Sequence, residues 1–443
     1  MSDGRLLRVL GVGFGLAVIV GNTIGAGIFR APGQVAAHLP DPGLFLAAWA
    51  VGGIYALIGA IQIAELGTML ARSGGQYVFA RHALGEYAGF LVGWSDWIST
   101  CGTTAAVTVV IAESSPELLP VFGGSVPALA GTVAVAFAAA QWRGIRQGSL
   151  IQNVTSLLKG AAFAALIASA FVFGGADAAT GAAEPSAASG LALATAFVLA
   201  LQGVIYTYDG WTGVVYFSEE VRDPGRSIPR ALFAGVLTVT AIYMLVNLSF
   251  LYVLPVGAIA GEEFAAGAVA SALFGDNGGF LLRVLTIVSM LSAVNAYHLM
   301  ASRVLFSMGR DGLVAGPVAR VNAGGTPTVA LLLSTVVAVL FIMLGRTFEK
   351  VITLLAFFFI ANYALSFISL IVLRRREPDR PRPYRAWGYP WTTALALLGS
   401  VAFLIGAVAA DTRNSIHALL LLAASYPAFR LIGRSKTSAA SSV

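Results

Sequence analysis

Two glycine-rich stretches of this sequence lie in the middle of long apolar segments. The first, at positions 21–27, reads GNTIGAG, and the second runs from Gly203 through Asp209 to Gly213. Each glycine weakens a helix by about 1 kcal/mol relative to alanine. Close packing of helices through small residues would also account for glycines alone. A carboxylate at mid-depth is costly unless it faces a cavity or a partner, so Asp209 favours a pair of broken helices around a site.

A break inside a membrane frees backbone N–H and C=O groups that protein, water or a ligand must satisfy. An amino acid zwitterion is a good complement. Its carboxylate would accept from N–H groups at the start of a half-helix, and its ammonium would donate to freed carbonyls. The predicted substrate-binding residues are Thr23, Gly25, Ala26, Gly27, Ile28, Tyr206, Thr207, Tyr208, Asp209 and Thr212.

Lys159 is a lysine inside another apolar segment, about a third of the way in from one end. It could snorkel to the headgroups, but the adjacent Gly160 and Ala161 favour a buried partner. Its ammonium could then donate to carbonyls of the broken first helix in place of a bound cation. A buried lysine can also change its protonation, which makes Lys159 a candidate for proton coupling.

Further polar residues occur in other apolar segments. Ser289 and Ser292 are predicted to line the core, although serines also join helices through hydrogen bonds. Glu65 and Asp96 are predicted to be structural partners of backbone or loop groups.

The composition requires an apolar environment for these residues. Of the 443 residues, 58% are hydrophobic and 11% are charged, whereas a soluble protein has about 25% charged residues. A single cysteine, Cys101, excludes an intramolecular disulfide and a multi-cysteine metal site. We therefore predict no metal and no cofactor. Apolar segments long enough to span a bilayer lie near 8–36, 43–71, 84–112, 126–142, 149–174, 189–218, 230–254, 279–309, 327–345, 349–373, 391–410 and 414–433.

The basic residues set the predicted orientation. If all twelve segments span, 21 of the 27 lysines and arginines fall on the side that holds both termini, and four fall on the other side. This asymmetry predicts cytoplasmic termini for a multi-pass protein of the bacterial inner membrane. The net charge of +6 then reflects topology, with lipid headgroups rather than nucleic acid as the anionic partner.

Several motifs resemble those of the amino acid–polyamine–organocation superfamily, and within it the L-type amino acid transporter branch. Positions 21–29, GNTIGAGIF, look like the first-helix G-[ST]-G-I-F motif, with Ala26 where serine is more usual. Positions 64–77 are similar to the E-L-G…S-G-G-x-Y signature. The longest match, 206–230, resembles the pattern F-A-Y-x-G-W…E-E…P…I-P-R, and 302–313 fit the segment after helix eight.

The resemblance implies an all-α membrane protein of twelve transmembrane helices. It implies the inverted five-plus-five repeat of the leucine-transporter type, with helices one and six broken. Residues 1–180 would form the first repeat and 181–376 the second. Residues 377–443 would form peripheral helices eleven and twelve and a cytoplasmic tail.

The resemblance also places Lys159 where members without sodium dependence carry a lysine. In those members the lysine replaces a sodium ion next to backbone that corresponds to Gly21 and Ile24. Two positions depart from the pattern. Tyr206 stands where a gating phenylalanine is common, and Thr212 stands where some animal members carry asparagine. Residues 113–125 contain no cysteine, so the disulfide-linked heavy chain of the animal members is not expected.

The leading functional hypothesis is sodium-independent transport of neutral L-amino acids by alternating access, driven by exchange or by a proton gradient. The alternative within the same fold is a transporter of cationic amino acids or polyamines, and a channel or an amino acid sensor is a third reading. An enzyme would need a nucleophile–base or metal constellation that the spacing of Ser, His and Asp does not supply. The oligomeric state stays open, a monomer included.

Overall fold

The computed structural model describes residues 6–175, 190–344, 348–410 and 412–440, which are largely helical and contain no strand. The helices are α1 Val12–Thr23, α2 Gly27–His38, α3 Pro42–Met69, α4 Gln76–Leu84, α5 Glu86–Glu113, α6 Val126–Trp142, α7 Ile145–Phe173, α8 Gly190–Tyr208, α9 Pro224–Val253, α10 Val256–Ile259, α11 Ala265–Phe274, α12 Gly278–Arg310, α13 Thr328–Met343, α14 Phe348–Arg376, α15 Trp391–Ala410 and α16 Thr412–Ala440.

The predicted apolar segments agree with these helices. Each of the twelve coincides with one long helix, except that the first divides into α1 and α2 and the sixth ends in a short 3₁₀ turn, Gly213–Phe217. Among the described residues, seven helices are long and apolar enough to cross a membrane, and the bent pair α1–α2 makes an eighth. The amphipathic α4 and the short α10 and α11 were not predicted, because each is too short to give a spanning signal.

Helix starts follow ordinary capping chemistry. At α3, the Asp41 side chain accepts from the Leu44 N–H at 2.8 Å, and Pro42 occupies the first helical position. Proline suits that position because its missing N–H would have no partner there. The same order of Asp and Pro, at Asp223 and Pro224, begins α9.

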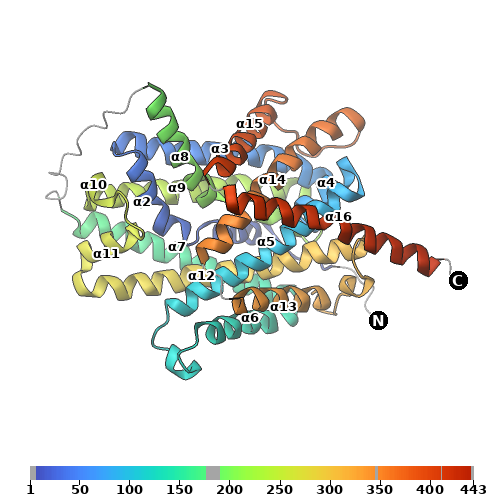
Figure 1. Ribbon diagram of the computed structural model, residues 1–443, viewed down its shortest axis with the longest axis horizontal. Coiled ribbons are helices and arrows are strands. Elements are labelled where there is room, and N and C mark those ends of the chain that lie inside the picture. The colour runs from blue at the N-terminus through green and yellow to red at the C-terminus, as the bar shows by residue number, and fades with distance from the viewer. Residues whose placement is uncertain (1–5, 176–189, 345–347, 411, 441–443) are drawn as a thin grey trace.

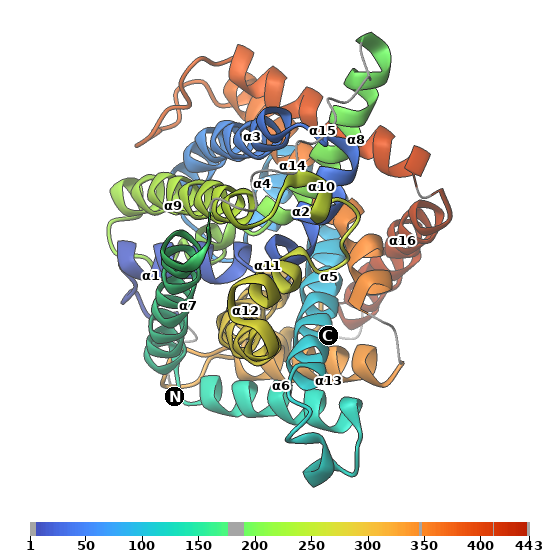
Figure 2. The same ribbon diagram turned by 90° about the vertical axis from the view of Figure 1, so that its left-hand side faces the viewer.

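The long helices lie roughly parallel to the longest axis of the molecule (Figure 1). Viewed along that axis, α1 lies inside the bundle, whereas α15 and α16 lie at its rim (Figure 2). Helix α1 packs against α7, α9 and α12. The first broken helix is therefore enclosed by protein, as its freed backbone groups require.

Ion pairs and hydrogen bonds join several loops at one end of the bundle. The Asp311 carboxylate pairs with Arg72 at 2.7 Å and with Arg81 at 3.4 Å, and Tyr77 donates to it at 2.9 Å. A single carboxylate thus ties the loop after α12 to the loop after α3 and to α4.

The segment before α1 pairs with the segment after the 3₁₀ turn. Leu10 N–H donates to the Glu220 carbonyl at 2.9 Å, and Arg222 N–H donates to the Leu10 carbonyl at 2.8 Å. The Glu220 side chain forms a two-pronged ion pair with Arg303 of α12, and both side chains are fully buried. Burial raises the pKa of the Glu220 carboxyl, and the Arg303 charge opposes that rise.

Glu65 has the structural role predicted for it. Its buried carboxylate accepts from Arg374 at 2.5 Å, from Arg382 at 3.0 Å and from the Ala386 N–H at 2.7 Å. These bonds hold the loop between α14 and α15 on α3.

Candidate functional site

The first apolar helix is broken at residues 24–26. Helix α1 ends at Thr23, Ile24 is extended, and α2 begins at Gly27 after a bend of 51°. A Cβ atom on Gly27 would lie 3.0 to 3.3 Å from side-chain and backbone atoms of Thr207. Glycine at this position therefore lets α2 approach α8 closely.

The second break follows directly after α8. The chain turns at residues 209–212, and Gly210 has a φ of +110°. A Cβ atom there would lie 3.0 Å from the backbone of Asn22 and of Thr23. The two breaks therefore touch, and Asn22 Nδ2 donates to the Gly210 carbonyl at 3.3 Å. Glycine meets both the backbone conformation and the close approach.

Tyr243 of α9 links the two breaks through one hydroxyl. Its oxygen lies 2.7 Å from the Thr23 carbonyl oxygen and 2.9 Å from the Thr207 carbonyl oxygen. The side chain is fully buried.

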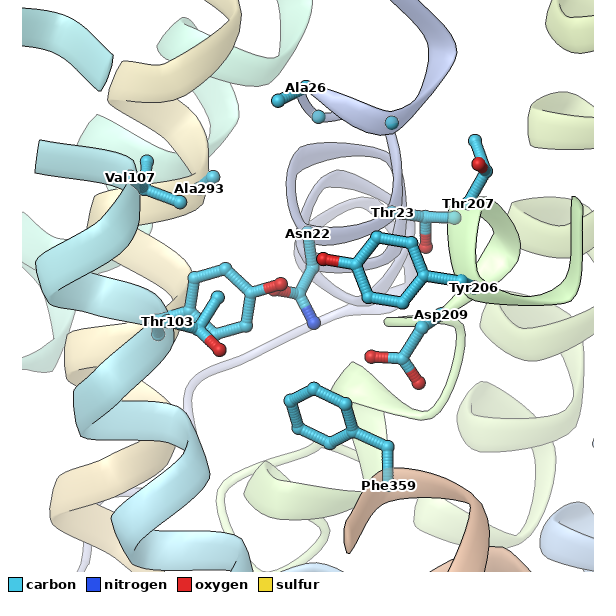
Figure 3. Close-up of a pocket in the computed structure, with 13 residues that line it drawn as sticks. Asn22, Thr23, Ala26, Thr103, Val107, Tyr206, Thr207, Asp209, Ala293 and Phe359 are labelled. Carbon is cyan, nitrogen blue, oxygen red and sulfur yellow. The ribbon is translucent and has the colours of Figure 1, made fainter. Parts of the chain in front are cut away.

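A cavity of about 50 Å³ lies beside the two breaks (Figure 3). Seven of the ten residues predicted to bind substrate line it: Thr23, Gly25, Ala26, Gly27, Tyr206, Thr207 and Asp209. Three do not. Ile28 is fully buried in α2, the Tyr208 hydroxyl donates to the Trp49 carbonyl, and Thr212 lines a smaller neighbouring cavity.

The cavity also contains residues that sequence reasoning did not select: Asn22, Thr103, Val107, Ala293, Tyr297 and Phe359. Thr103 and Val107 are four apart on α5, and Ala293 and Tyr297 are four apart on α12. Residues at that spacing share one helix face. The spacing is a weak signal, because every long helix contains such pairs.

Lys159 lies where the resemblance implied, against the first break. Its Nζ donates to the Gly21 carbonyl at 2.7 Å and also to the Ile24 carbonyl, and the side chain is fully buried. Ser289 donates to the Ile24 carbonyl at 3.2 Å, and Ser292 donates to the Gly21 carbonyl at 3.4 Å. The structure thus brings all five residues of the predicted cation-site group together.

A row of side-chain amides supports this region. Gln152 Nε2 donates to the Ala17 carbonyl at 3.1 Å, and its Oε1 accepts from Asn295 at 2.8 Å. Gln141 in turn donates to Asn295 Oδ1 at 2.9 Å. These bonds connect α6, α12, α7 and α1.

The second break is surrounded by acids and tyrosines. The Tyr363 hydroxyl donates to Asp209, and the Tyr216 hydroxyl lies 2.9 Å from each Asp96 oxygen. In Figure 3, the Asp209 carboxylate points into the space between Tyr206 and Phe359.

Comparison with known proteins identifies similar chains. The model of the amino acid permease family matches residues 14–425. The serine/threonine exchanger SteT of Bacillus subtilis (strain 168) is 29% identical over 443 residues, which are 99% of each chain. The human b(0,+)-type amino acid transporter 1 is 30% identical over 85% of this chain and 78% of its own. The mouse Asc-type amino acid transporter 1 is 29% identical over 86% of this chain and 73% of its own.

Proposed function

Because this chain belongs to the amino acid permease family of the amino acid–polyamine–organocation superfamily, and is thus an amino acid transporter, we propose that it moves neutral L-amino acids without sodium. Transport is by alternating access, as exchange or with a proton. The observation that carries the proposal is the Lys159 ammonium, which donates to the carbonyls of Gly21 and Ile24.

A lysine at this position makes a sodium ion unnecessary. The carbonyls freed by the first break need a cationic or hydrogen-bonding partner. Lys159, Ser289 and Ser292 already supply donors to them. A sodium ion at the same carbonyls would meet a fixed positive charge at close range, which is unfavourable in a low-dielectric interior.

The two breaks suggest how an amino acid binds. Within the described chain, no side chain caps the N-terminus of α2, where the helix dipole favours a carboxylate. The substrate carboxylate would therefore accept from backbone N–H groups near Gly27. The ammonium would face the carbonyls of Tyr206 and Thr207 across the cavity.

The size of the cavity favours a small substrate. Its volume is about 50 Å³, and the rings of Tyr206, Tyr297 and Phe359 are part of its wall. The similarity to a serine/threonine exchanger along 99% of both chains supports the same substrate class here. The side-chain hydroxyl of such a substrate would find hydrogen-bonding partners in Thr103 and Asn22.

Asp209 supports a second candidate, a cationic amino acid or a polyamine. Its carboxylate lines the cavity, which suits an ammonium. However, Tyr363 already donates to that carboxylate, and polyamines usually require more than one carboxylate in the cavity itself. Neutral substrates therefore remain the preferred proposal over this one, and over a channel or a sensor.

For the topology, we propose twelve membrane spans in two inverted repeats of five, residues 1–180 and 181–376, with 377–443 peripheral. Helices α5, α6, α13 and α16 complete the set begun by the more apolar helices. In support, loops assigned to the cytoplasm contact one another, as at Leu10–Val221 and Arg72–Asp311. The opposite end has its own contact, Arg283–Glu117 at 3.4 Å.

The proposed setting is the bacterial inner membrane, with cytoplasmic termini and lipids around the bundle. No heavy chain is proposed, because residues 114–125, between α5 and α6, contain no cysteine.

The test is uptake of radiolabelled amino acids and polyamines into proteoliposomes, with and without internal amino acid and with sodium replaced by choline. We expect uptake of small neutral amino acids that does not depend on sodium. A strict sodium requirement would refute the role of Lys159, and accumulation of polyamines alone would refute the neutral site.

A further inference from the structure

A second, smaller cavity adjoins the substrate cavity. Its volume is about 10 Å³, which is enough for about one water molecule. The residues that line both cavities are Asn22, Asp209, Tyr297 and Phe359. Asp96 of α5 lines the second cavity only and is 1% exposed. Two carboxylates, Asp96 and Asp209, therefore share one small enclosed space.

Neither carboxylate has a basic partner in the described part of the chain. The hydrogen bonds to their oxygens come from neutral hydroxyls, Tyr216 for Asp96 and Tyr363 for Asp209. Two ionised carboxylates in one desolvated space repel each other, and neutral donors do not remove that cost. The pair therefore requires one positive charge, either a proton or a bound cation.

The groups that face the pair are tyrosines. Tyr216, Tyr297 from α12 and Tyr363 from α14 line the same small cavity. The nearby positive charges are engaged elsewhere. Lys159 bonds to the first break, and Arg30 of α2 acts electrostatically on Tyr206.

Asn22 supplies an independent sign of a missing ligand. Its Oδ1 has no hydrogen-bond partner, although the residue is only 4% exposed. Figure 3 shows its amide directed into the space between Tyr206, Thr103 and Asp209. An amide oxygen is an acceptor only, so the ligand it awaits carries an N–H or O–H donor or a positive charge.

We propose that Asp96, Asp209 and Asn22 form a proton site, with one proton held between the two carboxylates or on a water molecule between them. The proton enters from the outside, travels with the amino acid and leaves to cytoplasmic water. No bond of the amino acid changes. This inference rests on the proposed function and assigns its driving force.

A proton suits this site better than a sodium ion. A metal cation needs several oxygens at the same time, but both Asp96 oxygens already accept from Tyr216. A proton needs a single lone pair. The space for about one water molecule is also too small for an ion that keeps part of its hydration shell.

The experiment measures protons and amino acids in the same proteoliposomes. A trapped pH-sensitive dye reports acidification, and radiolabelled L-serine, L-threonine and L-alanine report uptake, in choline medium. The wild-type protein is expected to move about one proton per amino acid, as a pair that shares one proton requires. Asp96→Asn is expected to lower the ratio of protons to amino acids roughly tenfold or more, because the pair loses its second titrating carboxylate.

Two further variants keep the test decisive. Asp96→Glu retains a carboxylate and is expected to keep a ratio close to the wild-type value, even if the flux falls or if Asp96→Asn does not fold. Asp276→Asn is the matched control, because Asp276 is an exposed carboxylate in the turn before α12, and its ratio should equal that of the wild type.

Failure of this inference can be told apart from failure of the proposed function. Uptake of amino acid without any acidification overturns the proton site but leaves amino acid transport in place. An unchanged ratio in Asp96→Asn also overturns it, as does acidification that requires sodium. If none of the three amino acids is taken up while other amino acids or polyamines are, the neutral-substrate proposal fails instead.

Discussion

The two helix breaks meet at one cavity, but they are completed in different ways. At the first break, a lysine and two serines of the protein occupy the freed carbonyls of Gly21 and Ile24. At the second break, the carboxylate of Asp209 faces the cavity and has only a tyrosine for a partner. The first break is thus satisfied internally, whereas the second is left for a ligand to complete. This difference divides the site into a part that keeps its shape and a part that meets the cargo.

The largest effect is expected where the internal completion is removed. Lys159→Ala takes the ammonium from two buried carbonyls, and each unsatisfied buried group costs about 1–3 kcal/mol. We expect uptake to fall roughly 100-fold, equivalent to about 3 kcal/mol. Initial rates in proteoliposomes measure this fall. The control is Arg283→Ala, which removes a positive charge from the exposed pair with Glu117. Uptake near the wild-type rate in Lys159→Ala would show that the serines suffice.

A substitution at the contact between the breaks should have the next largest effect. Gly210→Ala places a Cβ 3.0 Å from the backbone of Asn22 and Thr23, at a φ of +110°. The strain is on the order of 1–3 kcal/mol, so we expect uptake to fall roughly tenfold or more. Gly25→Ala is the matched control, because the nearest atom to its Cβ is the Met290 methyl at 4.0 Å. Equal effects of the two substitutions would contradict the close approach of the breaks.

Removing the internal partner of the second break should alter selectivity. Tyr363→Phe deletes the hydroxyl that donates to Asp209 and leaves that carboxylate free for an ammonium. Hydrogen bonds to charged groups contribute about 1.5–3 kcal/mol, so the ratio of L-lysine to L-serine uptake should rise about tenfold. Competition assays with both amino acids measure the ratio. An unchanged ratio would mean that Asp209 does not reach the substrate side chain.

The smallest effect is expected where the first break has a surplus of donors. Ser292 lies 3.4 Å from the Gly21 carbonyl, which Lys159 already reaches at 2.7 Å. Ser292→Ala removes a weak bond of at most about 1 kcal/mol, and uptake should change by about twofold at most. A tenfold loss would place Ser292 in the site itself and weaken the division between the two breaks.

Sequence reasoning found the breaks and the lysine, because glycines and a charge inside apolar segments conflict with a regular helix. It was less accurate near the ends of the helices. Tyr208 was expected in an unwound stretch, but α8 is helical up to this residue. A helix turns about 100° per residue, so Tyr206 faces the cavity while Tyr208 faces Trp49 of α3.

The parts of the cavity contributed by α5, α12 and α14 could not be predicted. Thr103, Tyr297 and Phe359 carry no local signal, since a polar or aromatic residue on a buried helix face packs equally well against any neighbour. Their place depends on how helices far apart in the chain are arranged. The motif at 21–27 contains Asn22, but nothing in the motif distinguished its side chain from the backbone groups around it.

The hydroxyl of Tyr243 makes the empty protein one hydrogen bond short. It lies within reach of two carbonyls, at Thr23 and Thr207, yet a hydroxyl has a single proton to donate. At any instant one of the two carbonyls goes without this donor. A substrate ammonium in the proposed pose brings three protons and supplies the missing one. Cargo and tyrosine together then match donors to acceptors across both half-helices, so the count of protons itself distinguishes the loaded transporter from the empty one.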